Sequence, residues 1–206
     1  MASVTLYPNG NGTFSANWGG TGTPGGNYTE LKDASDSTFA SCSANSQSSY
    51  YLFDDCPALL YLVTAVSWSF RCSKSSKSPA RNFTTIQCVQ SNESTALTGT
   101  ADVSGSSTSP TTLSGSFTIT GATDKASWDG MRLKITTAAT GSGSCSVYEM
   151  SITLTYDLAP TGRIHYAAAL DGLGGAGQQR FNPLMRSRIW TPPQRAIFVP
   201  AFSLSN

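Results

Sequence analysis

The sequence predicts an all-β protein: an antiparallel two-sheet β-sandwich of the jelly-roll type with an extended C-terminal arm. Three observations support this fold class. Only 12% of the 206 residues are charged while Ser, Thr and Gly are abundant, which is typical of β-rich extracellular and virion surfaces. Apolar and polar residues alternate in several segments, as they do in half-buried strands. Near Pro160 this alternation stops and a segment rich in arginine and proline begins.

The clearest predicted strands are residues 60–72 and 148–156. The apolar residues expected on one face of the first are Leu60, Leu62, Val66, Trp68, Phe70 and Cys72. Those expected on one face of the second are Tyr148, Met150, Ile152, Leu154 and Tyr156. Because only one face of each strand is apolar, the sheets are expected to be antiparallel, since parallel sheets are buried on both faces.

Shorter segments complete the predicted sandwich. Further candidate strands lie at 4–7, 28–31, 38–41, 50–53, 83–90, 113–119 and 131–135. Separated by Gly, Ser, Asn and Pro turns, the strands should number about eight to ten. The polar segment 73–80 contains Pro79 and predicts a hairpin between 60–72 and 83–90. No segment of the body has a convincing helical stripe.

The change near Pro160 divides the chain into three predicted parts. Residues 1–157 form the β-sandwich domain, residues 158–177 a linker in which 164–170 could form a short helix, and residues 178–206 an extended arm. Four prolines bar a regular helix in the arm and favour extended backbone. They are Pro183, Pro192, Pro193 and Pro200.

The arm is expected to bind a partner, because it mixes apolar and basic side chains and cannot bury its own apolar groups. The residues predicted to contact that partner are Arg180, Phe181, Leu184, Met185, Arg186, Arg188, Ile189, Trp190, Phe198 and Phe202. Residues 158–206 hold five arginines against one aspartate, whereas the body holds eight basic residues against eleven acidic ones. Arm and body of different copies should therefore attract each other. The alternatives are that the arm folds back on its own body, or that its charge is only solubilising.

Membranes and nucleic acids are not expected partners. No apolar run approaches the roughly 18 residues that span a bilayer. The five arginines are spread too thinly to form the dense basic stripe of a nucleic-acid-binding protein. The opening residues Met1-Ala2-Ser3 lack the basic and apolar regions of a secretory signal, so a product assembled in cytoplasm is expected.

The five cysteines are odd in number and show no Cys-x-x-Cys spacing of a zinc site. Most are expected to be reduced and partly buried. Cys42 and Cys56 flank an apparent turn and could form a bridge. Cys72 and Cys88 are not expected to face each other across the predicted hairpin.

No catalytic constellation is evident, so the chain is predicted not to be an enzyme and to need no cofactor. The only histidine, His165, lies beyond the body. The acidic residues of the loops are expected to form turns. Two readings stay open: calcium bound by Asp33, Asp36, Asp54 and Asp55, and a glycoside hydrolase that uses a pair of loop carboxylates among Asp54, Asp55 and Asp129.

Two tryptophans suggest glycan binding. Trp18 and Trp128 lie beside turn residues and could be exposed platforms for pyranose faces, whereas Trp68 belongs to the core face of its strand. The sequence therefore also allows a lectin-like module.

Several short motifs of the body form a recognisable set. They are Val4-Thr5-Leu6-Tyr7-Pro8-Asn9-Gly10-Asn11-Gly12-Thr13, Trp18, Tyr28-Thr29-Glu30-Leu31, Asp33-Ala34-Ser35-Asp36-Ser37-Thr38, Leu62-Val63-Thr64-Ala65-Val66 and Glu149-Met150-Ser151-Ile152-Thr153-Leu154-Thr155-Tyr156. Through these motifs the body resembles small β-sandwich structural proteins encoded in the virion gene clusters of tailed bacteriophages. It covers most of residues 1–157, whereas the arm departs from the family pattern.

The resemblance implies a non-enzymatic virion protein, either a head decoration or cementing protein or a minor capsid, neck or tail component. Its implied partners are further copies of itself and other virion proteins, such as the major capsid or the neck and tail proteins, and no catalytic residues come with it. The alternative is a carbohydrate-binding, receptor-binding β-sandwich module of a virion or cell surface.

Overall fold

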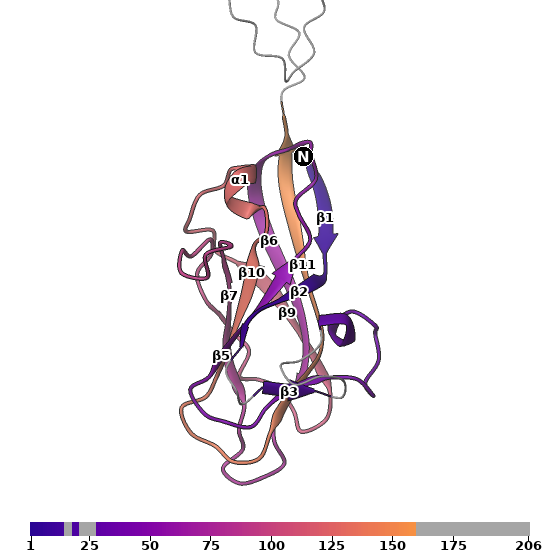
Figure 1. Ribbon diagram of the computed structural model, residues 1–206, viewed down its shortest axis with the longest axis vertical. Helices are drawn as coiled ribbons and strands as arrows, with labels where there is room; N and C mark the ends of the chain where they lie inside the picture. Colours follow the sequence, from indigo (N-terminus) through magenta and orange to yellow (C-terminus); the bar gives the residue numbers. More distant parts are fainter. Residues whose placement is uncertain (15–17, 21–27, 160–206) are drawn as a thin grey trace, which may run out of the picture. The chain divides into compact units, whose positions relative to one another are not determined.

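The computed structural model describes residues 1–14, 18–20 and 28–159, which form two packed antiparallel sheets (Figure 1). The strands of the larger, six-stranded sheet are β1 (Ala2–Leu6), β3 (Trp18–Gly20), β4 (Ala40–Cys42), β6 (Leu60–Ser73), β9 (Thr111–Phe117) and β11 (Cys145–Leu158). Their order is β3-β4-β11-β6-β9, and β1 also pairs with β11. The long strand β11 pairs with β4 near its beginning and with β1 near its end. β11 therefore connects the two ends of the sandwich.

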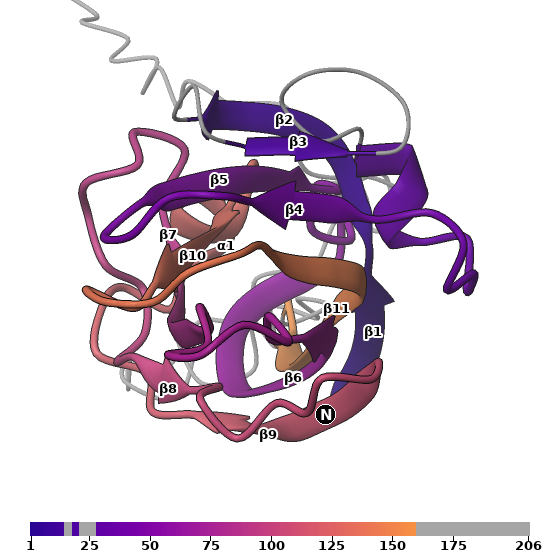
Figure 2. The ribbon, with the colours of Figure 1, turned by 90° about the horizontal axis from the view of Figure 1, so that it is seen from below.

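The smaller, five-stranded sheet has the order β2-β5-β10-β7-β8. Its strands are β2 (Pro8–Phe14), β5 (Ser48–Phe53), β7 (Phe83–Val89), β8 (Ala101–Asp102) and β10 (Arg132–Thr137). Figure 2 shows the strands of both sheets from below, toward their ends. The prediction of an all-β, antiparallel two-sheet sandwich is confirmed. Among the described residues, no helix has the length and apolarity to cross a membrane.

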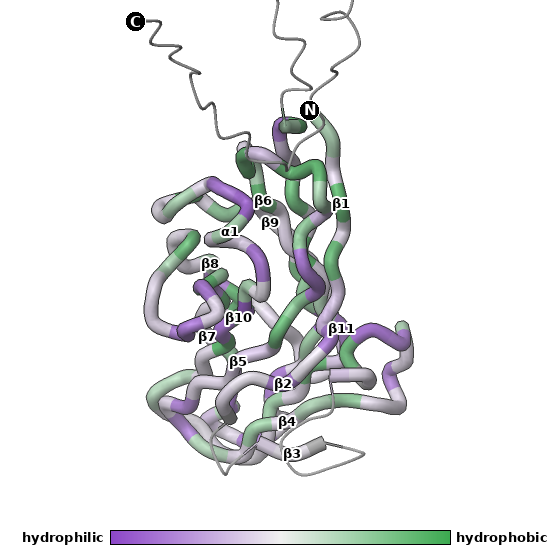
Figure 3. Tube along the Cα trace, turned by 45° about the horizontal axis from the view of Figure 1, so that its top comes forward, coloured by the Kyte–Doolittle hydropathy of each residue, from purple (hydrophilic) through white to green (hydrophobic). Residues whose placement is uncertain are grey.

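The core lies between the sheets, where the inward side chains of the long strands meet. Phe70 of β6 packs edge-on against Phe83 of β7, with ring centroids 5.6 Å apart. Both rings are fully buried. Figure 3 shows apolar and polar residues interleaved along the strands, as expected for strands buried on one face.

The outer face of the six-stranded sheet carries rows of hydroxyl groups. One row crosses four strands through the register pairs Thr5–Thr153, Thr153–Ser67 and Ser67–Ser116. The Oγ1 atoms of Thr5 and Thr153 lie 2.9 Å apart, within hydrogen-bond distance. This row therefore presents neutral hydroxyl groups on the outer face of the sheet.

Three register shifts in the pairing of β6 with β11 interrupt the predicted alternation. The register between β6 and β11 shifts at Val147/Glu149, so Tyr148 is only half-buried, contrary to the prediction. Further shifts near Tyr156 and Leu158 bring Val63 inward while Leu62 is only half-buried. A bulge adds one residue to one strand and so turns the following side chains to the other face.

The predicted hairpin between 60–72 and 83–90 is wrong. β6 pairs with β9 and β11, whereas β7 belongs to the other sheet. The segment between them crosses from one sheet to the other, and a polar turn composition does not distinguish such a crossing from a tight hairpin.

Two segments for which no helix was predicted form short helices. Residues Tyr28–Leu31 form a 3-10 helix, η1, where a strand was expected. Residues Lys125–Trp128 form a one-turn helix, α1, whose N-cap Asp124 accepts a hydrogen bond from the backbone N of Ser127. A single turn is too short to produce a helical stripe in the sequence.

Candidate functional site

The two tryptophans predicted to bind glycans are buried, so the prediction that they form exposed platforms is wrong. Trp18 is 3% exposed and stacks on Phe83 with ring centroids 6.0 Å apart. Trp128 is fully buried, and its Nε1 donates a hydrogen bond to the carbonyl of Ala122 over 2.8 Å. Neighbouring turn residues suggested exposure, but both indoles point into the core.

The predicted arm contacts lie outside the described residues and stay predictions. They are Arg180, Phe181, Leu184, Met185, Arg186, Arg188, Ile189, Trp190, Phe198 and Phe202. His165 also lies outside the described residues.

The four aspartates considered for calcium lie in two separate loops. Asp33 accepts hydrogen bonds from the backbone N of Ser35 and the hydroxyl of Thr38. Asp36 forms a two-pronged ion pair with Arg71 over 2.7 and 2.6 Å, and this hydrogen bonding holds the pKa of Asp36 below its usual range. Over residues 1–14, 18–20 and 28–159, no group of three or more His, Cys, Asp or Glu residues could hold a metal ion.

A group of described residues lies around residues 54–59, which connect β5 of one sheet to β6 of the other and lead toward the end of the sandwich that carries α1 (Figure 1). We call this region the loop end, and we define it by Asp54, Asp55, Leu59, Tyr61, Lys125 and Asp129, together with Tyr7, whose carbonyl accepts a hydrogen bond from the first loop residue, Asp54.

Hydrogen bonds connect Tyr7 to the loop 54–59, and that loop to α1. The backbone N of Asp54 donates to the carbonyl of Tyr7 over 3.4 Å. The backbone N of Cys56 donates to Oδ1 of Asp129 over 3.1 Å. Asp129 in turn pairs with Lys125, whose Nζ lies 2.7 and 2.5 Å from its two carboxylate oxygens. α1 is thereby fixed to the loop.

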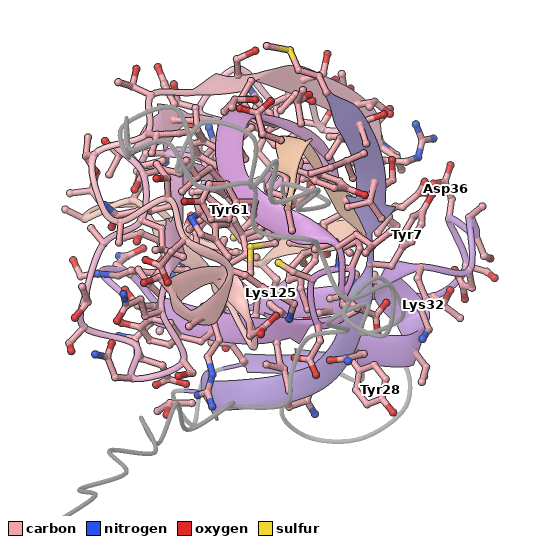
Figure 4. All side chains as sticks on the ribbon, turned by 90° about the horizontal axis from the view of Figure 1, so that it is seen from above. Tyr7, Tyr28, Lys32, Asp36, Tyr61 and Lys125 are labelled. Atoms are coloured by element: carbon pink, nitrogen blue, oxygen red, sulfur yellow. The ribbon has the colours of Figure 1, made fainter. Side chains whose placement is uncertain are left out.

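The second tyrosine is held next to α1 by the beginning of β6. Leu62 forms an isolated antiparallel bridge with Asp124, and the backbone N of Val63 donates to the carbonyl of Thr123 over 2.8 Å. Tyr61 therefore lies beside the first residue of α1, Lys125. Figure 4, which looks onto this end, labels Tyr61, Lys125 and Tyr7.

Large side chains at the loop end are unusually exposed. Tyr61 is 51% exposed and Tyr7 41%, and these are the two large exposed aromatic residues among those described. Leu59 is 62% exposed, and Leu158, whose strand partner is Leu60, is 50% exposed. Exposed apolar groups that gather in one place commonly mark a binding surface.

Hydrogen bonding and burial shift the pKa values of two groups at the loop end. The hydrogen bond to Asp129 raises the pKa of Lys125, so this ammonium group stays charged. Burial, assisted by the charge of Asp129, raises the pKa of the Cys56 thiol to about 12. A thiol with so high a pKa is a poor nucleophile at neutral pH. The loop end therefore offers hydrogen-bond donors, acceptors and aromatic rings, but no activated nucleophile among the residues described.

Asp129, one of the carboxylates considered for hydrolysis, has a structural role. Its oxygens accept from Cys56 and Lys125, so it anchors the loop to α1. Asp54 and Asp55 are exposed on the loop.

Sequence reasoning missed both tyrosines, although a signal for one of them was present. Tyr61 follows the inward residue Leu60 in a strand of period two, which places it on the outer face. Tyr7 separates β1 from β2, where the chain passes from one sheet to the other, and no period applies there.

Comparisons with known proteins give no family. No family model matches the chain. No curated protein matches it either.

Solved structures provide distant likenesses only. A C-terminal CBM6 of the laminarinase LamC from Zobellia galactanivorans is 9% identical with a TM-score of 0.42, over 75% of this chain and 100% of that one. A xylan-binding module, CBM15, is 13% identical with a TM-score of 0.43, over 76% and 99% of the two chains. Tailspike protein 4 of bacteriophage CBA120 is 10% identical with a TM-score of 0.38, over 74% of this chain and 19% of the tailspike. Likenesses at these TM-scores identify neither a ligand nor an activity.

Proposed function

We propose that the protein is a non-catalytic carbohydrate-binding β-sandwich module that holds a glycan at its loop end. The observation that carries this proposal is the pair of exposed tyrosines, Tyr61 near the beginning of β6 and Tyr7 at the turn between β1 and β2, where its carbonyl accepts a hydrogen bond from the backbone N of Asp54. A tyrosine ring presents a flat apolar face and a polar tip, so it can contact both the C–H face and the hydroxyl groups of a sugar.

The neighbouring side chains supply the polar half of such a site. The exposed carboxylates of Asp54 and Asp55 are acceptors for sugar hydroxyls, and the Lys125 ammonium is a donor. Because Lys125 is already held by Asp129, it loses little freedom when a ligand binds. The partly apolar, partly charged character of the loop end matches the two kinds of surface on a pyranose ring.

The same proposal holds that the protein does not hydrolyse the glycan that it binds. Asp129 is engaged with Lys125 and Cys56, and the raised pKa of Cys56 keeps that thiol protonated. These observations support binding without hydrolysis of the ligand.

A glycan array with the full chain tests the proposal. We expect binding to a restricted set of glycans, and loss of at least ten-fold in affinity, about 1.4 kcal/mol, in Tyr61→Ala and Tyr7→Ala. Tyr28→Ala is the matched control, because Tyr28 lies in η1 rather than at the loop end. An array without specific signals, or tyrosine variants that bind as the parent does, would count against a glycan site here.

A second candidate, bacteriophage virion structural protein, is supported by a different observation. The described body exposes the apolar side chains of Leu59, Leu158 and Met1, and the sequence continues beyond it with 47 residues rich in arginine and aromatic residues. Such a protein would be a head decoration, minor capsid, neck or tail component that assembles with copies of itself or with other virion proteins in the host cytoplasm.

Truncation after Ala159 tests this candidate, since the backbone N of Ala159 still donates to the carbonyl of Leu59. The full chain should form oligomers in light-scattering measurements and the truncated chain should stay monomeric, with circular dichroism as the control for folding. Equal self-association of both chains would contradict assembly through the arm.

A further inference from the structure

Two buried cysteines face each other across neighbouring strands at the end of the sandwich opposite α1. Cys42 of β4 and Cys145 of β11 are register partners in an antiparallel pair. Both are fully buried, so both side chains point to the inner face of the sheet. Sγ of Cys145 donates a hydrogen bond to the carbonyl of Cys42 over 3.8 Å. We call this the thiol end.

The backbone at this pair suits a disulfide without movement of the strands. Directly opposed residues of an antiparallel pair have Cα atoms roughly 4.5–5.5 Å apart. Disulfide-bonded cysteines have Cα separations of about 4.4–6.8 Å. Side-chain rotation is therefore the only change that a bond between Cys42 and Cys145 requires.

We propose that Cys42 and Cys145 form a cross-strand disulfide when the chain meets a low-molecular-weight disulfide such as oxidised glutathione. One cysteine thiolate attacks the oxidant, forms a mixed disulfide and releases one glutathione thiol. The second cysteine then attacks the mixed disulfide and releases the second glutathione thiol. Two protein thiols are oxidised to one disulfide and one glutathione disulfide is reduced to two thiols, so electrons and protons balance.

The other three cysteines are less suited to pairing. Cys72 of β6 is opposite Val147, so it is only a diagonal neighbour of Cys145. Diagonal positions lie roughly 7–8 Å apart, beyond the range of most disulfides. Cys88 belongs to β7 in the other sheet, and Cys56 lies at the loop end beside Asp129. The bridge between Cys42 and Cys56 considered from the sequence is absent in the structure, where all five thiols are free.

Burial determines when the bond can form. Burial raises the pKa of Cys145 to about 12 and also raises the pKa of Cys42, so thiolate is scarce in the closed fold. The neighbouring positive charge of Arg81, which is itself 7% exposed, partly offsets this effect at both thiols. β3 is the edge strand of its sheet and β4 is the next strand, and each is only three residues long, so their local opening is the route to Cys42. Oxidation should accordingly be fast during folding and slow afterwards.

Refolding of the full chain in reduced and oxidised glutathione tests the proposal. The refolded protein is alkylated, digested without reductant and mapped by mass spectrometry. We expect one cross-linked peptide pair that contains Cys42 and Cys145, with the other three thiols alkylated. Because the bond spans 103 residues, the oxidised protein should unfold on the order of 10 °C above the reduced one.

Three variants sharpen the result. Cys42→Ser and Cys145→Ser should each abolish the cross-link and the gain in Tm. Cys72→Ser is the matched control, since it removes a nearby buried thiol and should leave the cross-link intact. Alkylation of all five thiols after refolding, or a cross-link that involves Cys72, would overturn the proposal. Mapping of the unsubstituted chain decides the matter even if a serine variant fails to fold.

Discussion

The two ends of the sandwich use the same long strand for opposite purposes. Near its end, β11 pairs with β1 and with the beginning of β6, next to exposed Leu59 and Tyr61. Near its beginning, β11 holds Cys145 against Cys42 in full burial. The loop end presents aromatic, apolar and charged side chains to solvent, whereas the thiol end keeps its two cysteines inside. One strand, β11, thus runs from a closed end of the sandwich to an exposed one.

The largest effect should come from removing the aromatic residue beneath the loop end. Trp128→Ala deletes a fully buried indole and the hydrogen bond from its Nε1 to Ala122. We expect a loss of about 3–5 kcal/mol in the free energy of unfolding. Urea denaturation measures this loss. An effect under 1 kcal/mol would mean that α1 does not depend on its core contact.

A smaller loss is expected at the thiol end from Arg81→Ala. The Arg81 guanidinium donates to Oδ1 of Asn45 and to the carbonyl of Gly141. Removing it leaves those acceptors without this donor, which costs about 1–3 kcal/mol. Urea denaturation again applies, and Lys134→Ala, on a half-exposed lysine of β10, is the surface control. Equal effects of the two substitutions would show that the Arg81 network is not structural.

The exposed tyrosine of the loop end should matter for binding but hardly for stability. Because Tyr61 is 51% exposed, Tyr61→Ala is expected to change the free energy of unfolding by no more than about 0.5 kcal/mol. Tyr51→Ala, at a fully buried tyrosine of β5, should cost several times more. Thermal unfolding of both variants checks the contrast, which would fail if Tyr61→Ala proved as damaging as Tyr51→Ala.

The smallest effect is an acid dependence confined to the loop end. Hydrogen bonds from Ser127 hold the pKa of Asp124 below its usual range. A depressed carboxyl pKa contributes stability that is present above the unfolded pKa, about 3.9, and is lost as the pH falls through the folded value. Hydrogen exchange should therefore show weaker protection of α1 near pH 3 than near pH 6.

Asp124→Asn is the control for this pH dependence. Asparagine keeps an N-capping oxygen and does not titrate, so protection of α1 should vary less with pH in this variant. An unchanged acid dependence in Asp124→Asn would assign the effect to another carboxyl group.

Sequence reasoning predicted the fold class because two long strands, β6 and β11, carry a period-two pattern over many residues. It failed where a bulge interrupts that period, as at Tyr148, and where a polar segment crosses between sheets. A single local pattern cannot reveal either event, since both depend on which strand lies opposite.

The candidate site was harder to predict than the fold. The turn residues beside Trp18 and Trp128 suggest that these side chains could be exposed, yet each indole fills core space. Tyr61 was predictable from strand alternation alone, whereas Tyr7 and the pairing of Cys42 with Cys145 required the order of the strands.

The hydroxyl rows on the outer face of the six-stranded sheet have a consequence for how copies of the protein meet. The row that contains Thr5, Thr153 and Ser67 has neither charged nor apolar side chains. Two molecules that collide through such faces gain little from displacing water, so they separate again. In a concentrated solution, copies of this protein should therefore not adhere through this row of the six-stranded sheet, and lasting contacts are left to other surfaces.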